Sequence, residues 1–271
     1  MKKLSTIFVF LLAVCFVHAQ DKPSSDKVQD NKANQVLTNA HKAVSKKKNV
    51  NDIKGFTLTW ERKRQLSFPD GKILQTSKSE TGLALPDKIY QNTTSNQTNS
   101  IQEEKYVLNG NSFYWDFAAF VDGKLQNFDK GMIKDEQQLS YLKRETFLLN
   151  FPITLDSSWY IPLQFDYVGI AESKDGKAEV IEAVSSNNIK YRLFFDNEKH
   201  LLLLMTESWT TKDNKPFENK YFYSDYREKD GILIATKIVN ERNGEVFEEK
   251  EIKDVKFNPT FKPDTFEVKR K

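Results

Sequence analysis

The chain has 271 residues, of which 41 are Lys or Arg and 38 are Asp or Glu, and it contains one cysteine. Charges of both signs are mixed along the sequence, and the formal net charge at pH 7 is only +3. A nucleic-acid-binding protein concentrates its basic residues in a stripe or patch, so this distribution argues against a nucleic-acid partner.

The N-terminal segment, residues 1–19, has the three parts of a signal peptide. Lys2 and Lys3 precede an apolar run from Ile7 to Val17, and Ala19 ends a small-residue cleavage pattern ahead of Gln20. The run is shorter than the roughly 20 residues that a membrane-spanning helix needs. We therefore expect export from the cytoplasm, with cleavage after Ala19.

The only cysteine, Cys15, lies inside this signal peptide. A lipidated cysteine normally follows a small residue, whereas Val14 precedes this one, so we expect no lipid anchor at Cys15. Cleavage after Ala19 also removes Lys2 and Lys3, which leaves 39 Lys and Arg against 38 Asp and Glu. The mature chain then forms no disulfide, and its stability has to come from packing.

The mature chain is expected to begin with a flexible leader over residues 20–32, because this segment is almost entirely polar. Apolar residues then recur at three- and four-residue steps from Ala33 to Val44, which predicts an amphipathic helix. We expect a single domain over residues 33–271, since all-β domains of this size are common.

Beyond residue 52 the apolar period changes to two, which predicts strands. Phe56, Leu58 and Trp60 share one face of the first strand. Further strands are predicted over residues 72–80, 87–94, 104–108 and 113–117, with the polar tract 93–100 as a separator and Asn109-Gly110 as a hairpin turn. Helical spacing returns over residues 135–150 and is expected to stop at Pro152, followed by a loop over residues 156–162.

The C-terminal hundred residues predict a regular succession of strands. Turn pairs such as Asp230-Gly231 and Asn243-Gly244 separate the strands and are typical of tight hairpins. The seven predicted strands are 165–171, 178–183, 189–195, 201–210, 220–226, 232–240 and 246–257. The expected fold class is therefore mainly β within α+β, a curved antiparallel meander whose inner side is covered by the helices.

The sequence has no recognisable catalytic or metal-binding motif. His41 is expected on a solvated helix face, and His200 follows the polar residues 196–199 at a spacing that fits a turn and no known metal motif. The acidic stretch from Glu245 to Glu251 alternates with lysine and indicates the solvated face of a strand. No Gly-x-Ser-x-Gly motif occurs. We therefore expect no enzyme activity, no cofactor and no metal site.

Several segments carry a family resemblance. They are the hairpin from Tyr106 to Trp115, the run from Tyr191 to Asp196, the segment from Tyr223 to Ile232, and the ending from Ile252 to Asn258 with Phe261 and Asp264 to Phe266. Together they resemble the periplasmic outer-membrane lipoprotein-sorting family, the LolA-like proteins. The resemblance implies an incomplete barrel with helices plugging its mouth, and an apolar cavity for acyl chains.

The resemblance also implies a periplasmic protein that takes part in transport and outer membrane biogenesis. Its expected partners are a lipid or lipoprotein acyl chains and envelope proteins, with transient membrane contact, and we expect a monomer. The alternative is an envelope interaction or sensor module with a filled core and no carried ligand. The candidate residues for the apolar cavity are Phe56, Leu58, Trp60, Phe113, Trp115, Tyr191, Phe195, Tyr221, Tyr223 and Ile234.

Overall fold

A computed structural model describes residues 26–68, 71–97, 99–133, 136–155, 163–174, 176–186, 188–211 and 213–267. The expected signal peptide, the cleavage site and the loop at 156–162 lie outside these residues.

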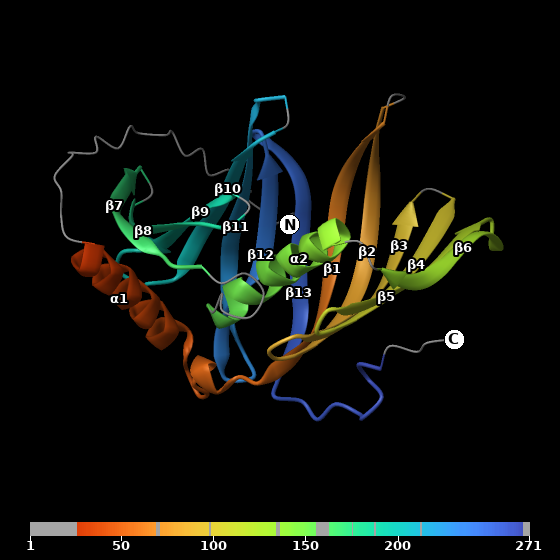
Figure 1. The fold of residues 1–271 in the computed structure, drawn as a ribbon, viewed down its shortest axis with the longest axis horizontal. Helices are drawn as coiled ribbons and strands as arrows, with labels where there is room; N and C mark the ends of the chain where they lie inside the picture. Colours follow the sequence, from red (N-terminus) through yellow and green to blue (C-terminus); the bar gives the residue numbers. More distant parts are fainter. Residues whose placement is uncertain are drawn as a thin grey trace, which may run out of the picture.

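The described chain is dominated by one antiparallel sheet of 13 strands (Figure 1). Two meanders, β1 to β6 and β7 to β13, join through the pair β1–β13, so the order across the sheet is β6-β5-β4-β3-β2-β1-β13-β12-β11-β10-β9-β8-β7. The first meander comprises β1 (Gly55–Phe68), β2 (Gly71–Ala84), β3 (Lys88–Gln97), β4 (Ser100–Asn109), β5 (Ser112–Val121) and β6 (Lys124–Ile133). The second comprises β7 (Asp166–Ser173), β8 (Gly176–Val184), β9 (Lys190–Asp196), β10 (Leu202–Thr210), β11 (Pro216–Lys229), β12 (Ile232–Arg242) and β13 (Glu245–Phe257).

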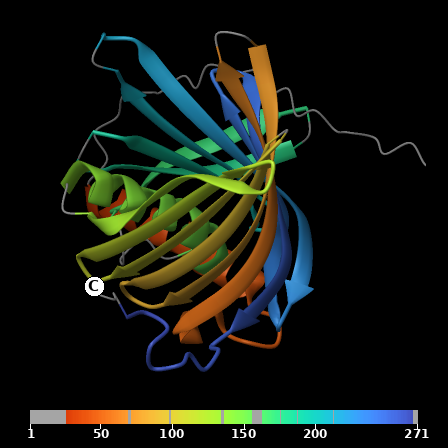
Figure 2. The same ribbon diagram turned by 90° about the vertical axis from the view of Figure 1, so that its right-hand side faces the viewer.

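The sheet is strongly curved, and it stays open (Figure 2). Its outermost strands are β6 and β7, which are not paired with each other in the described sheet. The long helix α2 (Glu136–Thr154) connects these two edge strands in sequence and lies in front of the central strands in Figure 1. An incomplete barrel is thus confirmed as the architecture.

Two hairpins of the second meander have the turn geometry that their sequences predict. Asp230 and Gly231 both have positive φ, 46° and 87°, and Asn243 and Gly244 have 49° and 86°. Two consecutive residues with positive φ match the right-handed twist of the flanking strands, and Asp, Asn and Gly adopt this backbone most easily. All seven C-terminal strands are confirmed, with ends shifted by a few residues.

The two long helices are both longer than their sequence patterns predict. Helix α1 (Asp26–Val44) begins within the segment expected to be a leader. Helix α2 continues through Pro152 to Thr154, although proline lacks the N–H that would bond four residues back. Phe151 and Ile153 are buried on either side of this proline, and their burial offsets the helix-breaking cost of about 3 kcal/mol.

The first meander departs most from its prediction. Strand β6 was not predicted, because it is an edge strand whose Leu125 and Phe128 are half exposed and break any clean alternation. The polar tract 93–100 was expected to separate strands, whereas Thr93 and Ser95 lie inside β3 and are buried. They belong to a sheet face that is polar in this region.

Most buried apolar residues form one core cluster that includes side chains from both helices and both meanders. Helix α1 contributes Ala33, Val36, Ala40 and Val44 along a single stripe, as its spacing predicts. A short 3-10 turn, η1 (Val50–Asp52), leads from this helix into β1. Neither described helix is both long enough and apolar enough to cross a bilayer.

Candidate ligand-binding site

The concave face has an apolar row at one end. Phe56 on β1 pairs with Phe257 on β13, and their rings meet edge to face at 6.2 Å between centroids. The pairing continues across four more strands and places apolar residues side by side in the register. The full row is Phe257, Phe56, Leu83, Ile89, Leu108 and Phe113, all of them buried. We call these six residues the apolar row.

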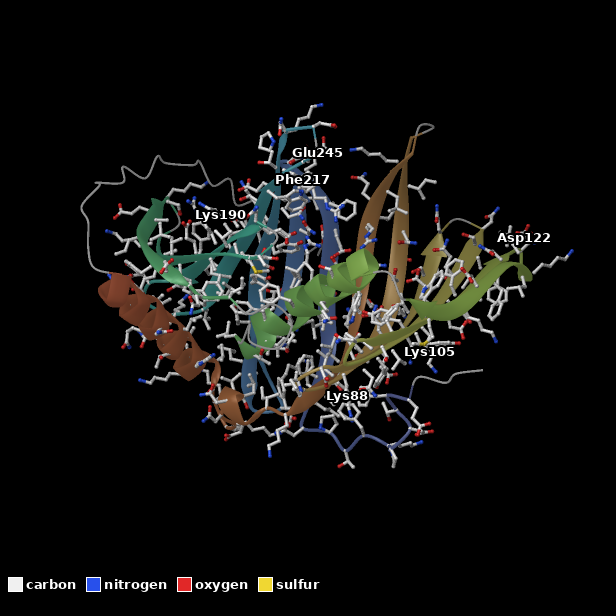
Figure 3. The ribbon with its side chains drawn as sticks, viewed as in Figure 1. Lys88, Lys105, Asp122, Lys190, Phe217 and Glu245 are labelled. Atoms are coloured by element: carbon white, nitrogen blue, oxygen red, sulfur yellow. The ribbon has the colours of Figure 1, made fainter. Side chains whose placement is uncertain are left out.

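The same strands become charged at their other end. Successive inward positions on β1 run from Phe56 through Leu58 and Trp60 to Arg62 and Arg64, because side chains two residues apart share a face. On β13 the partners of Arg62 and Arg64 are Lys250 and Glu248. We call Arg62, Arg64, Glu248 and Lys250 the charged cluster. Figure 3 marks the two ends of the face, with Lys88 near the apolar row and Glu245 near the charged cluster.

Glu248 holds the charged cluster together. Its carboxylate accepts hydrogen bonds from Nε and Nη2 of Arg64 at 3.0 and 2.8 Å, lies 2.8 Å from Nζ of Lys250, and lies 3.6 Å from Nη1 of Arg62. The Glu248 side chain is only 4% exposed. Burial alone would raise the pKa of this carboxyl, but Lys250, Arg64 and Arg62 lower the pKa to about 2. Glu248 is therefore ionised at any physiological pH.

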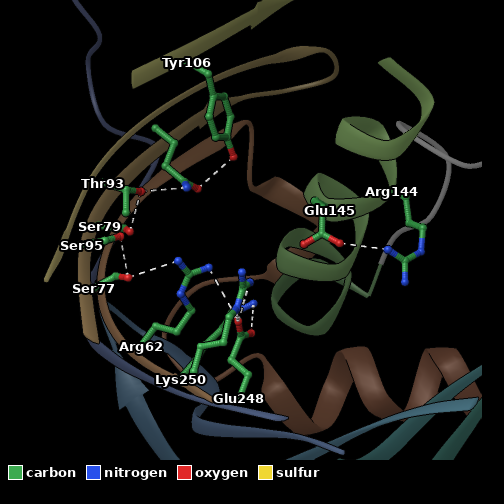
Figure 4. Close-up of polar contacts among 12 residues, drawn as sticks. Arg62, Ser77, Ser79, Thr93, Ser95, Tyr106, Arg144, Glu145, Glu248 and Lys250 are labelled. Carbon is green, nitrogen blue, oxygen red and sulfur yellow. Dashed lines mark hydrogen bonds and ion pairs between the residues drawn. The ribbon is translucent and has the colours of Figure 1, made fainter. Parts of the chain in front are cut away.

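A hydroxyl ladder crosses β2 and β3 between the two ends (Figure 4). The side-chain oxygens of Ser77 and Ser95 lie 2.9 Å apart, and those of Ser79 and Thr93 lie 2.8 Å apart. Nη2 of Arg62 donates to Ser77 at 3.1 Å, which joins the ladder to the charged cluster. These polar groups tolerate burial because they bond to one another.

Helix α2 has its own polar anchor on the opposite wall. Arg144 donates through Nε to Glu207 of β10 at 3.0 Å and through Nη1 to Glu145 at 2.9 Å, and its Nη2 also donates to Glu207. Glu207 is fully buried and accepts a further bond from the hydroxyl of Tyr221 at 2.9 Å. Burial alone would lower the pKa of Arg144, but the nearby Glu207 raises it, so the guanidinium remains charged.

A cavity of about 30 Å³ lies between α2 and strands β1 and β11 to β13. It is lined by Arg64, Glu145, Leu148, Leu149, Tyr221, Tyr223, Ile238, Asn240, Arg242, Glu248 and Lys250. A space of this size holds about two water molecules. An acyl chain is far larger, so it can enter this space only if α2 moves away from the sheet.

The ten candidate residues from the sequence lie in the interior, but in two different environments. Nine are buried, and Trp115 is half-buried with its ring stacked on Phe117 at 5.7 Å. Phe56 and Phe113 belong to the apolar row, and Leu58, Trp60, Trp115, Phe195, Tyr223 and Ile234 belong to the core cluster or pack against it. Tyr191 and Tyr221 lie beside Glu207 and Arg144, and burial followed by Glu207 raises the pKa of both phenols. Contact of these ten with a ligand stays a prediction.

The charged residues of the interior were missed from sequence. The stretch from Glu245 to Glu251 was expected on a solvated face, and this is wrong for Glu248, which is buried. The signal that would have found these residues is the two-residue spacing of inward side chains along each strand. Extending the inward series beyond Trp60 leads directly to Arg62 and Arg64, and extending it backwards from Ile252 leads to Lys250 and Glu248.

The two histidines of the described chain, His41 and His200, lie in different environments. Nε2 of His41 lies 3.3 Å from the carbonyl oxygen of Leu155, so this ring is partly buried and not simply solvated as expected. His200 closes a polar turn in which Oδ1 of Asp196 accepts the backbone N–H groups of Glu198 and Lys199. Among the described residues, no three His, Cys, Asp or Glu side chains come together in a way that could hold a metal ion.

Comparison with solved structures gives matches over nearly the whole chain. A domain named for outer membrane lipoprotein sorting, from Vibrio parahaemolyticus, is 11% identical with a TM-score of 0.50, over 89% of this chain and 96% of its own. A LolA superfamily protein from Nitrosomonas europaea is 10% identical with a TM-score of 0.51, over 87% of this chain and 97% of its own. The fold is LolA-like.

A DUF1329 family protein from Desulfovibrio piger matches the LolA-like fold of this chain equally well. It is 10% identical with a TM-score of 0.52, over 88% of this chain and 97% of its own. Comparison of the sequence with protein-family models and with curated proteins finds no match. At these identities the likeness extends to the fold alone, so the function of the LolA-like chain has to be argued from its own residues.

Proposed function

We propose that this protein is a periplasmic carrier without enzymatic activity, which binds a lipid or the acyl chains of a lipoprotein against the concave face of its sheet. The observation that carries the proposal is the apolar row, in which six buried apolar side chains lie side by side on adjacent strands of one curved sheet. A concave apolar wall with movable cover is the usual form of a site for a hydrophobic ligand. The LolA-like fold supports the same reading.

Ligand entry in this proposal requires α2 to move, because the cavity beneath it is too small for a chain. Leu148 and Leu149 are half-buried over the cavity, whereas Phe147 and Phe151 of the same helix are fully buried. Exposing the two leucines costs about 3–6 kcal/mol, and burying about ten methylene groups of a ligand contributes about 8 kcal/mol. Burial of a long acyl chain can therefore offset the cost of lifting these two leucines from the cavity.

The direct test is extraction of the purified mature protein with organic solvent, followed by mass spectrometry, together with titration by a fluorescent fatty acid. We expect a co-purified lipid and saturable uptake of the probe. Trp115→Gln removes a half-buried ring from the wall and should weaken probe binding about 10-fold. Leu74→Gln is the matched control, since Leu74 is 60% exposed and lies on β2 outside the core cluster.

A second function, an envelope interaction module with a filled core, is favoured by one observation, the small volume of the cavity. Ile101, Leu125 and Phe128 near the β6 edge are also 44%, 56% and 50% exposed, and such apolar surface can receive a protein partner. Absence of extracted lipid, with no probe uptake by the unmodified protein, would reject carriage and leave this second function.

A further inference from the structure

We propose that the cavity beneath α2 is an anion site, in which Arg242 and Lys250 bind the carboxylate or phosphate head of an amphiphilic ligand whose chain extends toward the apolar row. This rests on the proposed function, because head and chain belong to the same ligand. Nothing in the fold likeness requires an anionic head, so the inference depends on the charges inside this chain.

Three cations from three strands meet at the cavity. Arg64 of β1, Arg242 of β12 and Lys250 of β13 all line it, while the acids of the lining are Glu145 and Glu248. Both acids already have partners, Glu145 in Arg144 and Glu248 in Arg64 and Lys250. Of the three cations that line the cavity, Arg242 is therefore the one that pairs with neither carboxylate.

Arg242 is the cation with the most unused donors. Cζ of its guanidinium lies over the ring of Phe247, 3.5 Å from the centroid, and the side chain takes part in none of the ion pairs among the described residues. Its buried Nε has no hydrogen-bond partner there. Arginine can keep such a contact with an aromatic ring while its N–H donors hold a carboxylate or a phosphate.

Two further buried groups lack partners beside the cavity. The side chain of Asn240 is 5% exposed, lines the cavity, and has an Oδ1 atom with no partner in the described chain. Since amide oxygen and nitrogen exchange by a simple flip, this side chain can donate to an anion. Nε of Arg62, whose guanidinium lies 3.6 Å from the cavity residue Glu248, is also buried and unpaired. Unpaired buried polar groups are costly, so the unpaired donors, Nε of Arg242 and Nε of Arg62, point to a missing acceptor.

The local charge balance also favours an anion. The charged cluster and Arg242 together contain four cations, Arg62, Arg64, Lys250 and Arg242, and one carboxylate, Glu248. Arg144 adds a fifth cation, and its partners Glu145 and Glu207 add two carboxylates. Counting also Glu104, which acts on Arg62, gives five cations and four carboxylates. Burial and the neighbouring Arg64 lower the pKa of Arg62, so a bound anion would stabilise this cation.

The path from this cavity to the apolar row suits a lipid. The inward side chains of β13 run from Lys250 through Ile252 and Val255 to Phe257. At about 3.3 Å per residue, seven residues of strand span about 23 Å, which exceeds the roughly 15 Å of hydrocarbon in one leaflet of a bilayer. A chain of leaflet length with its head at Lys250 therefore fits within this path, and it extends along Ile252 toward Val255.

The test compares palmitate, methyl palmitate and inorganic phosphate as ligands of the full mature protein, by titration calorimetry at one ionic strength. Palmitate should bind at least about 10-fold more tightly than its uncharged ester, because a charge-assisted hydrogen bond contributes about 1.5–3 kcal/mol. Arg242→Met and Lys250→Met should each remove most of this difference and leave ester binding unchanged. Lys253→Met is the control, since Lys253 lies on the same strand and is 40% exposed.

The outcomes separate the anion site from the proposed carrier function. Equal affinity for acid and ester, with no effect of Arg242→Met, would overturn the anion site while leaving chain binding in place. Binding of phosphate that Arg242→Met abolishes, without binding of either palmitate form, would support a site for free anions and reject carriage. If none of the three ligands binds, both proposals fail. Thermal unfolding of each variant separates loss of binding from loss of fold.

Discussion

The two ends of the concave face are built from the same strands and have opposite chemistry. At one end β1 and β13 pack Phe56 against Phe257, and at the other end they bring Arg64 to Glu248. Both ends are buried, but burial stabilises the first by removing apolar area from water and is tolerated at the second only because ions are paired. An interior with both kinds of wall is suited to a ligand that has an apolar and a charged part.

The apolar end should give the largest loss of stability when truncated. Phe56→Ala removes a fully buried ring from the apolar row and should lower the free energy of unfolding by about 3–5 kcal/mol. Urea unfolding followed by circular dichroism measures this loss. Leu74→Ala, an exposed change on the neighbouring strand, should stay within about 0.5 kcal/mol. A loss below about 1 kcal/mol for Phe56→Ala would mean that the row is not packed as described.

The charged end should instead show a dependence on pH. The pKa of Glu248 is about 2 in the folded protein against an ordinary 4.5, so its contribution is complete above about pH 4.5 and disappears as the pH falls toward 2. This contribution is on the order of 3 kcal/mol. Glu248→Gln should therefore be less stable than the unmodified protein at pH 7, and the gap should close in acid.

The matched control for this titration is Glu249→Gln, because Glu249 is the next residue of β13 and is exposed. Unfolding free energies of the three proteins between pH 7 and pH 2.5 provide the comparison. If Glu248→Gln and Glu249→Gln lose stability in parallel as the pH falls, the paired state of Glu248 is refuted.

The boundary between the two ends should give the smallest effect. Ser79→Ala removes one partner of the 2.8 Å contact with Thr93, whose hydroxyl keeps a bond from Nε2 of Gln91 at 3.0 Å. The expected loss is about 1 kcal/mol, the usual net contribution of one hydrogen bond. Thr94→Ala, an exposed change on β3 next to Thr93, should cost less. Equal losses for the two variants would contradict a buried hydroxyl ladder.

Local chemistry predicted the elements well where one face is apolar. Asp230-Gly231 and Asn243-Gly244 are hairpin turns, and β12 and β13 around them match their predicted ranges to within two residues. The same reasoning missed β6, which is an exposed edge, and stopped α2 at Pro152, where buried neighbours outweigh the proline. In each case the deciding energy comes from tertiary packing, which a local pattern does not contain.

The candidate site was predictable in its apolar half and not in its charged half. Alternation around Phe56 and Trp60 marked a buried face, but charged residues in a strand ordinarily indicate solvent, and the stretch that contains Glu248 was assigned accordingly. The burial of Glu248 depends on its ion pairs with Arg62 and Arg64 of β1. Neither segment alone indicates that β1 and β13 will be neighbours.

The sequence by itself determined the alternation along each strand, the positions of the tight turns and the amphipathic stripe of α1, because each depends on residues only a few positions apart. The tertiary structure alone decided that β1 pairs with β13, that the sheet stays open between β6 and β7, and that Arg64, Arg242 and Lys250 line one cavity. The pairing of β1 with β13 joins residues nearly two hundred positions apart in the chain, such as Arg64 and Glu248. Such contacts form only when the whole curved sheet assembles.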